Sequence, residues 1–113
     1  MQRARLSAAT AAAVMAASLL AACSSKPVDR TAGWSPNRTY AEAKDEQNSG
    51  AYDKAVPLFE TLEGRAAGTP LAQQAQLDKA YSQFKDGQKA EAIATLDRFM
   101  RLHPASPAID YAL

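Results

Sequence analysis

The sequence contains an internal repeat, which restricts the chain to a few kinds of fold. Leu77 follows Tyr40 by 37 positions, and Gly87 follows Gly50 by the same interval. The same shift superposes Ala43 on Ala80, Ala55 on Ala92, Phe59 on Leu96 and Leu62 on Phe99. Repeats of this length are typical of solenoids, in which each unit is a pair of helices that buries its apolar face against the next pair.

Short local signals predict where the helices begin and end. A hydroxyl residue precedes proline at Ser35-Pro36, Thr69-Pro70 and Ser106-Pro107, and such pairs are typical of an N-cap and the first helical residue. Gly50 and Gly87 stand where each first helix should end, because glycine adopts the left-handed backbone at no steric cost. We predict an all-α helix-turn-helix solenoid over residues 36–113, with two repeats and the start of a third. Because the third repeat has no second helix, the domain looks truncated.

The second predicted helix contains a proline, Pro57. A proline in a helix interior costs about 3 kcal/mol, whereas one in the first turn forfeits at most one hydrogen bond. An N-cap at Asp53 would place Pro57 in that first turn.

Apolar residues of two sizes recur in the repeats. Alanines allow neighbouring helices to approach closely, and larger side chains fill the space between layers. The residues expected to pack or turn the repeats are Ala43, Gly50, Ala55, Phe59, Leu62, Ala80, Gly87, Ala92, Leu96, Phe99 and Pro104.

The N-terminus has the pattern of a targeting signal. Arg3 and Arg5 precede a charge-free, alanine-rich stretch over residues 6–20, and small residues follow it. A basic region, an apolar region and a small-residue cleavage site are typical of a secretory signal peptide. The apolar stretch is shorter than the roughly 20 residues that a permanent membrane span needs. We therefore predict a signal peptide over residues 1–22.

The cleavage region resembles the bacterial lipobox. It reads Leu20-Ala21-Ala22-Cys23, and Cys23 is the only cysteine in the chain. The resemblance implies cleavage before Cys23, which would carry a diacylglyceryl thioether and an N-acyl chain. An incidental thiol in an ordinary signal peptide is the alternative. Ser24 follows the cysteine, and the resemblance then implies transport to the outer membrane, with the protein facing the periplasm.

Residues 23–35 form a predicted lipidated N-terminus and flexible tether, since they mix Ser, Pro, Gly and charged residues without periodicity. Trp34 is the large apolar residue of this stretch. It either contacts the first helix just before its N-cap or serves as an exposed aromatic for a partner.

Composition and motifs argue against several function classes. The formal net charge is +1, and removing residues 1–22 takes away two arginines, leaving 11 basic against 12 acidic residues. That balance predicts no nucleic-acid partner. One cysteine and one histidine, His103, do not supply a zinc site. The acidic residues look like single charges on solvated helix faces. No nucleophile elbow, phosphate loop or metal motif is present, so we predict neither a metal site, nor a cofactor, nor an enzyme.

The turns resemble those of the tetratricopeptide repeat, whose second helix usually follows a Gly-x-Tyr-x-x-Ala turn. Residues 50–55 read Gly-Ala-Tyr-Asp-Lys-Ala, and residues 87–92 read Gly-Gln-Lys-Ala-Glu-Ala, with Lys89 where Tyr is usual. Such repeats present a concave groove to peptides. The candidate groove residues are Tyr40, Lys44, Gln47, Leu77, Tyr81, Phe84 and Lys85. Alternatively, the apolar members are interhelix core and the polar members are plain surface.

Three further strings resemble the N-terminal part of the BamD family of outer-membrane protein assembly lipoproteins: residues 73–78, 98–104 and 110–112. The resemblance implies a lipid-anchored periplasmic scaffold whose partners are BamA, other assembly subunits and unfolded outer-membrane proteins. The repeats that mainly dock BamA in that family would be absent here. The sequence leaves open a pilus-assembly or envelope-maintenance lipoprotein, or a small structural lipoprotein without a groove. An envelope hydrolase would need a catalytic set beyond Leu113.

Overall fold

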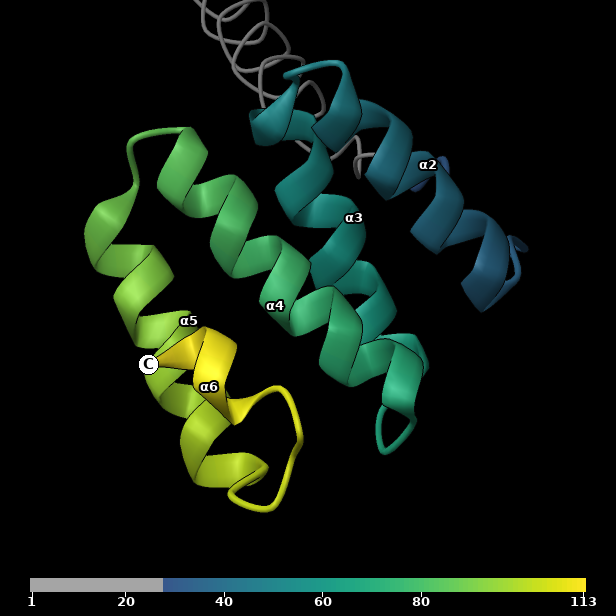
Figure 1. The fold of residues 1–113 in the computed structure, drawn as a ribbon. Coiled ribbons are helices and arrows are strands. Elements are labelled where there is room, and N and C mark those ends of the chain that lie inside the picture. Colours follow the sequence, from purple (N-terminus) through teal and green to yellow (C-terminus); the bar gives the residue numbers. More distant parts are fainter. Residues whose placement is uncertain (1–27) are drawn as a thin grey trace, which may run out of the picture. The chain divides into compact units, whose positions relative to one another are not determined.

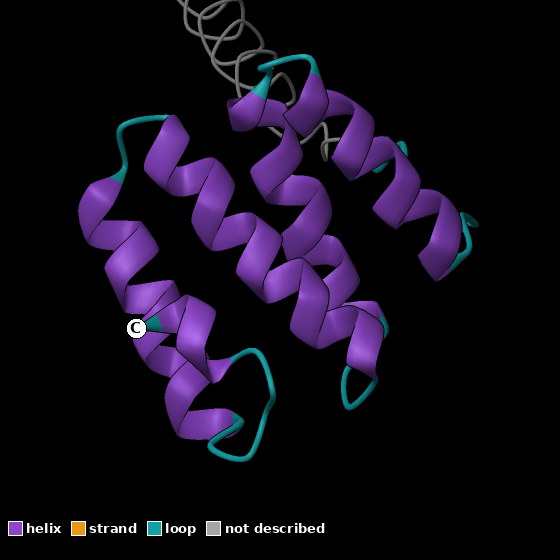
Figure 2. Cartoon of the chain, viewed as in Figure 1, coloured by secondary structure: helices purple, strands orange, loops and turns teal. Residues whose placement is uncertain are grey.

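Helices make up the regular structure of the described part of the chain, residues 28–113 of a computed structural model (Figure 2). They are α2 (Pro36–Asn48), α3 (Tyr52–Arg65), α4 (Pro70–Lys85), α5 (Lys89–Leu102) and α6 (Ile109–Ala112). No strand occurs in these residues. The predicted all-α helix-turn-helix fold is therefore confirmed. The predicted signal peptide and Cys23 lie outside the described residues.

Each helix packs against the next one in the chain, from α2 through α6 (Figure 1). α2 and α3 form the first pair, α4 and α5 the second, and α6 lies against α5. α4 packs on both α3 and α5. Because α4 is covered from two sides, it determines how the two pairs fit together.

The first two hydroxyl-proline pairs start helices as predicted. The backbone N–H of Arg38 donates to Ser35 Oγ and that of Ala72 to Thr69 Oγ1, each at 3.2 Å. The third pair does not start a helix, because α6 begins at Ile109 with Ala108 as its N-cap. Ser106 instead closes a turn, in which its Oγ accepts from the N–H of Ala108 at 3.2 Å.

The turn inside each pair has the geometry of a Schellman motif. Gly50 and Gly87 both have φ 82°, the left-handed conformation that favours glycine. The N–H of Ala51 donates to the Glu46 carbonyl at 2.9 Å, and the N–H of Gln88 donates to the Gln83 carbonyl at 2.8 Å. These bonds satisfy carbonyls at the ends of α2 and α4 and reverse the chain within a few residues.

The start of α3 differs from the prediction. Its N-cap is Ala51, whose carbonyl accepts from the N–H groups of Lys54 and Ala55 at 3.1 Å each. Asp53 is therefore inside the first turn, where a carboxylate is favourable near the free N–H groups. Pro57 lies in the helix interior rather than in the first turn. Its ring is exposed, and the N–H that it lacks would have bonded to the Asp53 carbonyl.

The core lies along the helix contacts. Ala43, Ala55, Phe59, Leu62, Ala66 and Ala75 form a buried cluster between α2, α3 and α4. Ala80, Ala92, Phe99 and Ala112 are buried nearer the C-terminus. Leu96, expected to pack the repeats, is only half-buried, and Pro104 is exposed because α5 ends at Leu102 and the proline lies in the following turn.

The folded unit begins before the predicted end of the tether, and it spans Thr31–Leu113. Thr31 is buried, and its carbonyl accepts from Arg65 Nη1 at 2.8 Å. Trp34 is half-buried, with the Arg38 guanidinium carbon 4.3 Å from the centre of its ring. The contact supports the interpretation of Trp34 as an apolar residue packed beside the N-cap of α2.

Candidate functional site

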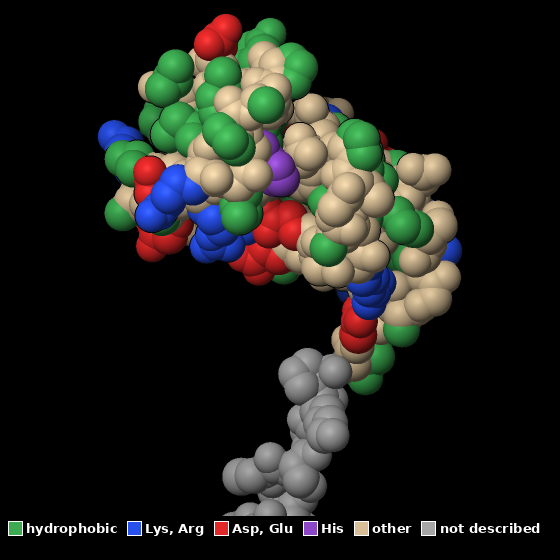
Figure 3. All heavy atoms as spheres, turned by 90° about the horizontal axis from the view of Figure 1, so that it is seen from below, with side chains coloured by type: hydrophobic (Ala, Val, Ile, Leu, Met, Phe, Trp, Pro, Cys, Tyr) green, Lys and Arg blue, Asp and Glu red, His purple; other side chains and the backbone are tan. Residues whose placement is uncertain are grey.

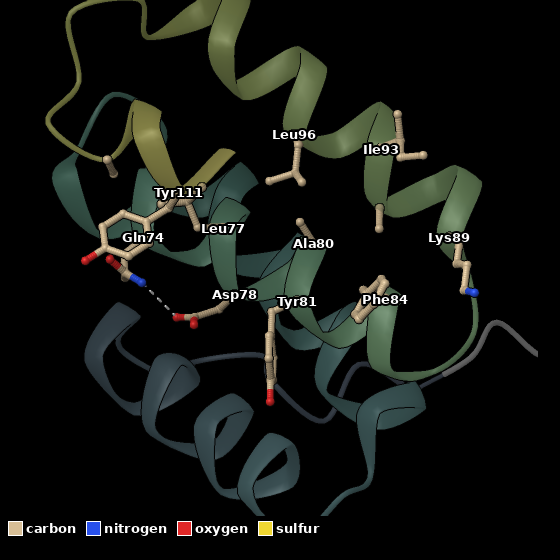
Figure 4. Close-up of a pocket in the computed structure, with 12 residues that line it drawn as sticks. Gln74, Leu77, Asp78, Ala80, Tyr81, Phe84, Lys89, Ile93, Leu96 and Tyr111 are labelled. Carbon is tan, nitrogen blue, oxygen red and sulfur yellow. Dashed lines mark hydrogen bonds between the residues drawn. The ribbon is translucent and has the colours of Figure 1, made fainter. Parts of the chain in front are cut away.

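The candidate groove consists of two adjoining parts. The larger, the apolar cleft, has a volume of about 700 Å³ and lies between α4, α5 and the C-terminal segment (Figure 4). The smaller, the polar pocket, has a volume of about 420 Å³ and lies between α2, the start of α3 and α4. Asp78 and Tyr81 of α4 line both parts, so the two are continuous along this helix.

Two helices, α4 and α5, supply most of the side chains that line the apolar cleft. In Figure 4, Tyr81 and Phe84 project from α4, while Ile93 and Leu96 project from α5. The cleft is lined by Gln74, Leu77, Asp78, Ala80, Tyr81, Phe84, Lys89, Ala92, Ile93, Leu96, Ala108 and Tyr111. The lining is therefore mostly apolar.

Exposure separates core residues from surface residues among the predicted groove positions. Tyr81 is 51% exposed and Phe84 56% exposed, so neither is core, and both line the apolar cleft. Leu77 is half-buried at the same cleft. Large apolar side chains that gather at a surface are a mark of binding sites.

Two predicted groove residues line neither part. Tyr40 packs edge-on against the buried ring of Phe59, with centroids 6.1 Å apart, and so belongs to the interface between helices. Lys85 is exposed, and its Nζ lies 5.9 Å from the centre of the Tyr81 ring. It therefore lies beside the groove, next to a tyrosine that lines it.

The polar pocket is built around a carboxylate that the sequence did not single out, Asp78. Its Oδ2 accepts from the Tyr40 hydroxyl at 2.9 Å and from Gln74 Nε2 at 3.3 Å. Its Oδ1 accepts from Lys44 Nζ at 3.3 Å. Gln47 Nε2 donates to the backbone carbonyl of Asp78 at 3.1 Å. The one residue thus joins α2 to α4 and shapes the groove wall.

The environment of Tyr40 keeps its hydroxyl protonated. Burial, the hydrogen bond to Asp78 and the negative charge of Asp78 together raise the pKa of Tyr40 to about 12. The hydroxyl therefore acts as a donor to Asp78 throughout the physiological pH range. Nothing in this arrangement activates a nucleophile or a general base.

Two other polar side chains of α4, Lys79 and Gln83, are buried and paired with neighbouring helices. Lys79 is only 4% exposed, and its Nζ lies 2.9 Å from Glu63 Oε2 on α3. Thr95 Oγ1 of α5 donates to the buried Gln83 Oε1 at 2.7 Å. Acidic residues of this fold are therefore not all solvated, since Glu63 and Asp78 both hold helices together.

The described residues show no sign of a metal site. Within residues 28–113, no group of three His, Cys, Asp or Glu side chains could hold a metal ion. Of the helices in this range, none is both long and apolar enough to cross a membrane. On the face shown in Figure 3, basic and acidic side chains lie next to each other. His103 caps the end of α5, with its ring 5.2 Å from that of Phe99.

Comparison with known families identifies the architecture. A family model for the tetratricopeptide repeat matches residues 28–113. The chain belongs to the tetratricopeptide-repeat family. The helical pairs, the glycine turns and the small residues at helix contacts are the corresponding features of this structure.

Curated relatives of the chain carry the name outer membrane protein assembly factor BamD. The protein of Neisseria meningitidis serogroup B is 50% identical over 99 residues, covering 83% of this chain and 37% of the relative. That of Neisseria gonorrhoeae is 49% identical, covering 78% and 33%, and that of Vibrio cholerae 35% identical, covering 92% and 43%. The chain spans about two-fifths of their length or less. The predicted resemblance to BamD is confirmed.

Proposed function

We propose that this chain is a lipid-anchored periplasmic scaffold for the assembly of outer-membrane β-barrel proteins. It binds extended segments of unfolded substrates or partner subunits in the apolar cleft and polar pocket. Its partners in this proposal are unfolded outer-membrane proteins, BamA and other subunits of the assembly machinery. The similarity to BamD supports the process, and no catalytic chemistry is needed for it.

The cleft carries the binding part of the proposal. Its apolar wall is open to solvent, since Tyr81 and Phe84 are each more than half exposed. An unfolded β-barrel protein offers alternating apolar side chains and free backbone hydrogen-bonding groups. The apolar cleft suits the apolar side chains, and the polar pocket suits the backbone hydrogen-bonding groups.

Tyr81→Ala is expected to weaken capture of unfolded outer-membrane proteins about tenfold, because a large aromatic at a binding site contributes on the order of 1–2 kcal/mol. The measurement is site-specific crosslinking in envelope membranes, followed by mass spectrometry of the captured proteins. Leu102→Ala is the matched control, since Leu102 is 61% exposed and lies outside the cleft. Equal capture by both variants would contradict the proposal. If Tyr81→Ala loses capture and thermal stability in parallel, Tyr81 acts in helix packing rather than in binding.

The anchoring part of the proposal depends on Cys23. Lipoprotein processing needs a thiol at this position, so Cys23→Ser is expected to accumulate as an uncleaved precursor without lipid. Two or more acyl chains give stable membrane anchoring, and the variant should therefore leave the membrane fraction unless its signal peptide retains it. Precursor size and incorporation of labelled palmitate are the readouts, with Ser25→Ala as the control. Normal processing and labelling of Cys23→Ser would refute the assignment.

A further inference from the structure

The polar pocket contains one cation and one anion, and they lie against each other. Lys44 Nζ is 3.3 Å from Asp78 Oδ1 and also donates to Gln47 Oε1 at 2.6 Å. Both residues line the polar pocket, where the Lys44 side chain is 34% exposed and the Asp78 side chain is 12% exposed. On its own, the Lys44 ammonium would attract a carboxylate, but the Asp78 carboxylate neutralises its charge.

We propose that Asp78 sets the selectivity of the groove, an inference that rests on the proposed function. By neutralising Lys44, Asp78 favours an uncharged internal segment of an extended polypeptide over a free C-terminal carboxylate. The occupant is a length of chain that presents backbone carbonyl and N–H groups to the polar pocket while its apolar side chains lie in the apolar cleft.

Asp78 is fixed in this position by several contacts. Tyr40 and Gln74 donate to its Oδ2, and Gln47 donates both to its backbone carbonyl at 3.1 Å and to Ser82 Oγ at 2.9 Å. The carboxylate cannot turn away from Lys44 without breaking its bonds to Tyr40 and Gln74. An incoming carboxylate at Lys44 therefore meets a fixed negative charge nearby, and like charges at contact distance repel.

Neutral hydrogen-bonding groups meet no such penalty. Asn48, Tyr52 and Tyr81 also line the polar pocket and carry amide or hydroxyl groups suited to a peptide backbone. Figure 4 shows Asp78 and Lys89 on different sides of the apolar cleft. A segment that fills the cleft and continues along α4 into the polar pocket must pass Asp78, because this residue lines both parts.

The test compares two fluorescent peptides of one alternating aromatic and polar sequence, one ending in a carboxamide and one in a free carboxylate. Binding to the purified full chain in detergent is measured by anisotropy. The wild-type chain is expected to bind the carboxamide a few-fold more tightly. Asp78→Asn, which keeps the shape of the side chain, should reverse the preference, with the carboxylate bound about fivefold more tightly and less so at high salt.

Asp97→Asn is the matched control, because Asp97 pairs with Arg101 on the exposed face of α5 and lines neither part of the groove. It should keep the wild-type preference. Lys44→Gln leaves Asp78 without its cation and should strengthen the carboxamide preference about fivefold. If circular dichroism shows that Asp78→Asn does not fold, the peptide preference of Lys44→Gln tests the role of Asp78 instead.

Each outcome has a distinct meaning. A wild-type preference for the carboxylate, or unchanged preferences in Asp78→Asn and Lys44→Gln, would overturn the role of Asp78 while leaving the peptide groove intact. Failure of the wild-type chain to bind either peptide would overturn this inference together with peptide binding in the groove.

Discussion

Ala55→Glu is expected to unfold the first repeat. Ala55 has no exposed surface and belongs to the cluster with Ala43, Phe59 and Leu62. A carboxylate at this point of contact has neither space nor a hydrogen-bond partner, and its burial costs about 4 kcal/mol or more. A loss of that size is comparable with the total stability of a small domain, about 5 kcal/mol at the low end. Helical circular dichroism and the melting transition should both decrease strongly.

Ala94→Glu provides the comparison for Ala55→Glu. Ala94 lies in the middle of α5 and is exposed, so the same substitution should change stability by about 0.5 kcal/mol or less. Equal melting temperatures for the two variants would show that α3 does not pack as described.

The glycine turns explain why much of the fold could be predicted from the sequence. Gly50 and Gly87 act locally, since a left-handed residue ends a helix whatever surrounds it. The same turns explain why the predicted N-cap at Asp53 was wrong. The Schellman bond from Ala51 to the Glu46 carbonyl fixes the chain so that Ala51 itself caps α3. A side-chain cap at Asp53 would have delayed the helix by two residues, and the turn geometry prevents that delay.

The polar half of the candidate site could not be predicted in the same way. Asp78 and Lys79 lie on a helix that mixes polar and apolar residues, and nothing local indicates that α4 is covered on two sides. Their partners are distant in the chain: Tyr40 and Lys44 for Asp78, and Glu63 for Lys79. Only the spacing of Gln74 and Asp78, four residues apart on one helix face, gave a local signal. Tyr81 and Phe84 were predicted because the chain resembles a repeat family that presents a groove to peptides, and both lie on α4, the first helix of the second repeat.

Lys79→Met is expected to lower the free energy of unfolding by about 2–3 kcal/mol. The Lys79 ammonium is bonded to Glu63, and the Glu63 side chain is 21% exposed. The other carboxylate oxygen, Glu63 Oε1, is buried and has no hydrogen-bond partner among the described residues. Removing the cation leaves a largely buried carboxylate uncompensated, a change that costs 3–5 kcal/mol in full burial and less at this partial exposure. Urea unfolding followed by circular dichroism gives the value.

A double variant separates the charge from the packing at Lys79. Glu63→Gln combined with Lys79→Met removes both charges, so stability should return to within about 1 kcal/mol of the wild type, since an ion pair replaced by neutral groups of similar size is often nearly neutral. Lys54→Met, at an exposed position of α3, should have an effect of about 0.5 kcal/mol or less. If the double variant is as unstable as Lys79→Met alone, the loss comes from the packing of the lysine stem. If Lys79→Met behaves like Lys54→Met, the bond between α3 and α4 contributes no net stability. The two repeats are then held together by the apolar contacts around Leu62 and Ala75 and by the bonds from Asp78 to α2.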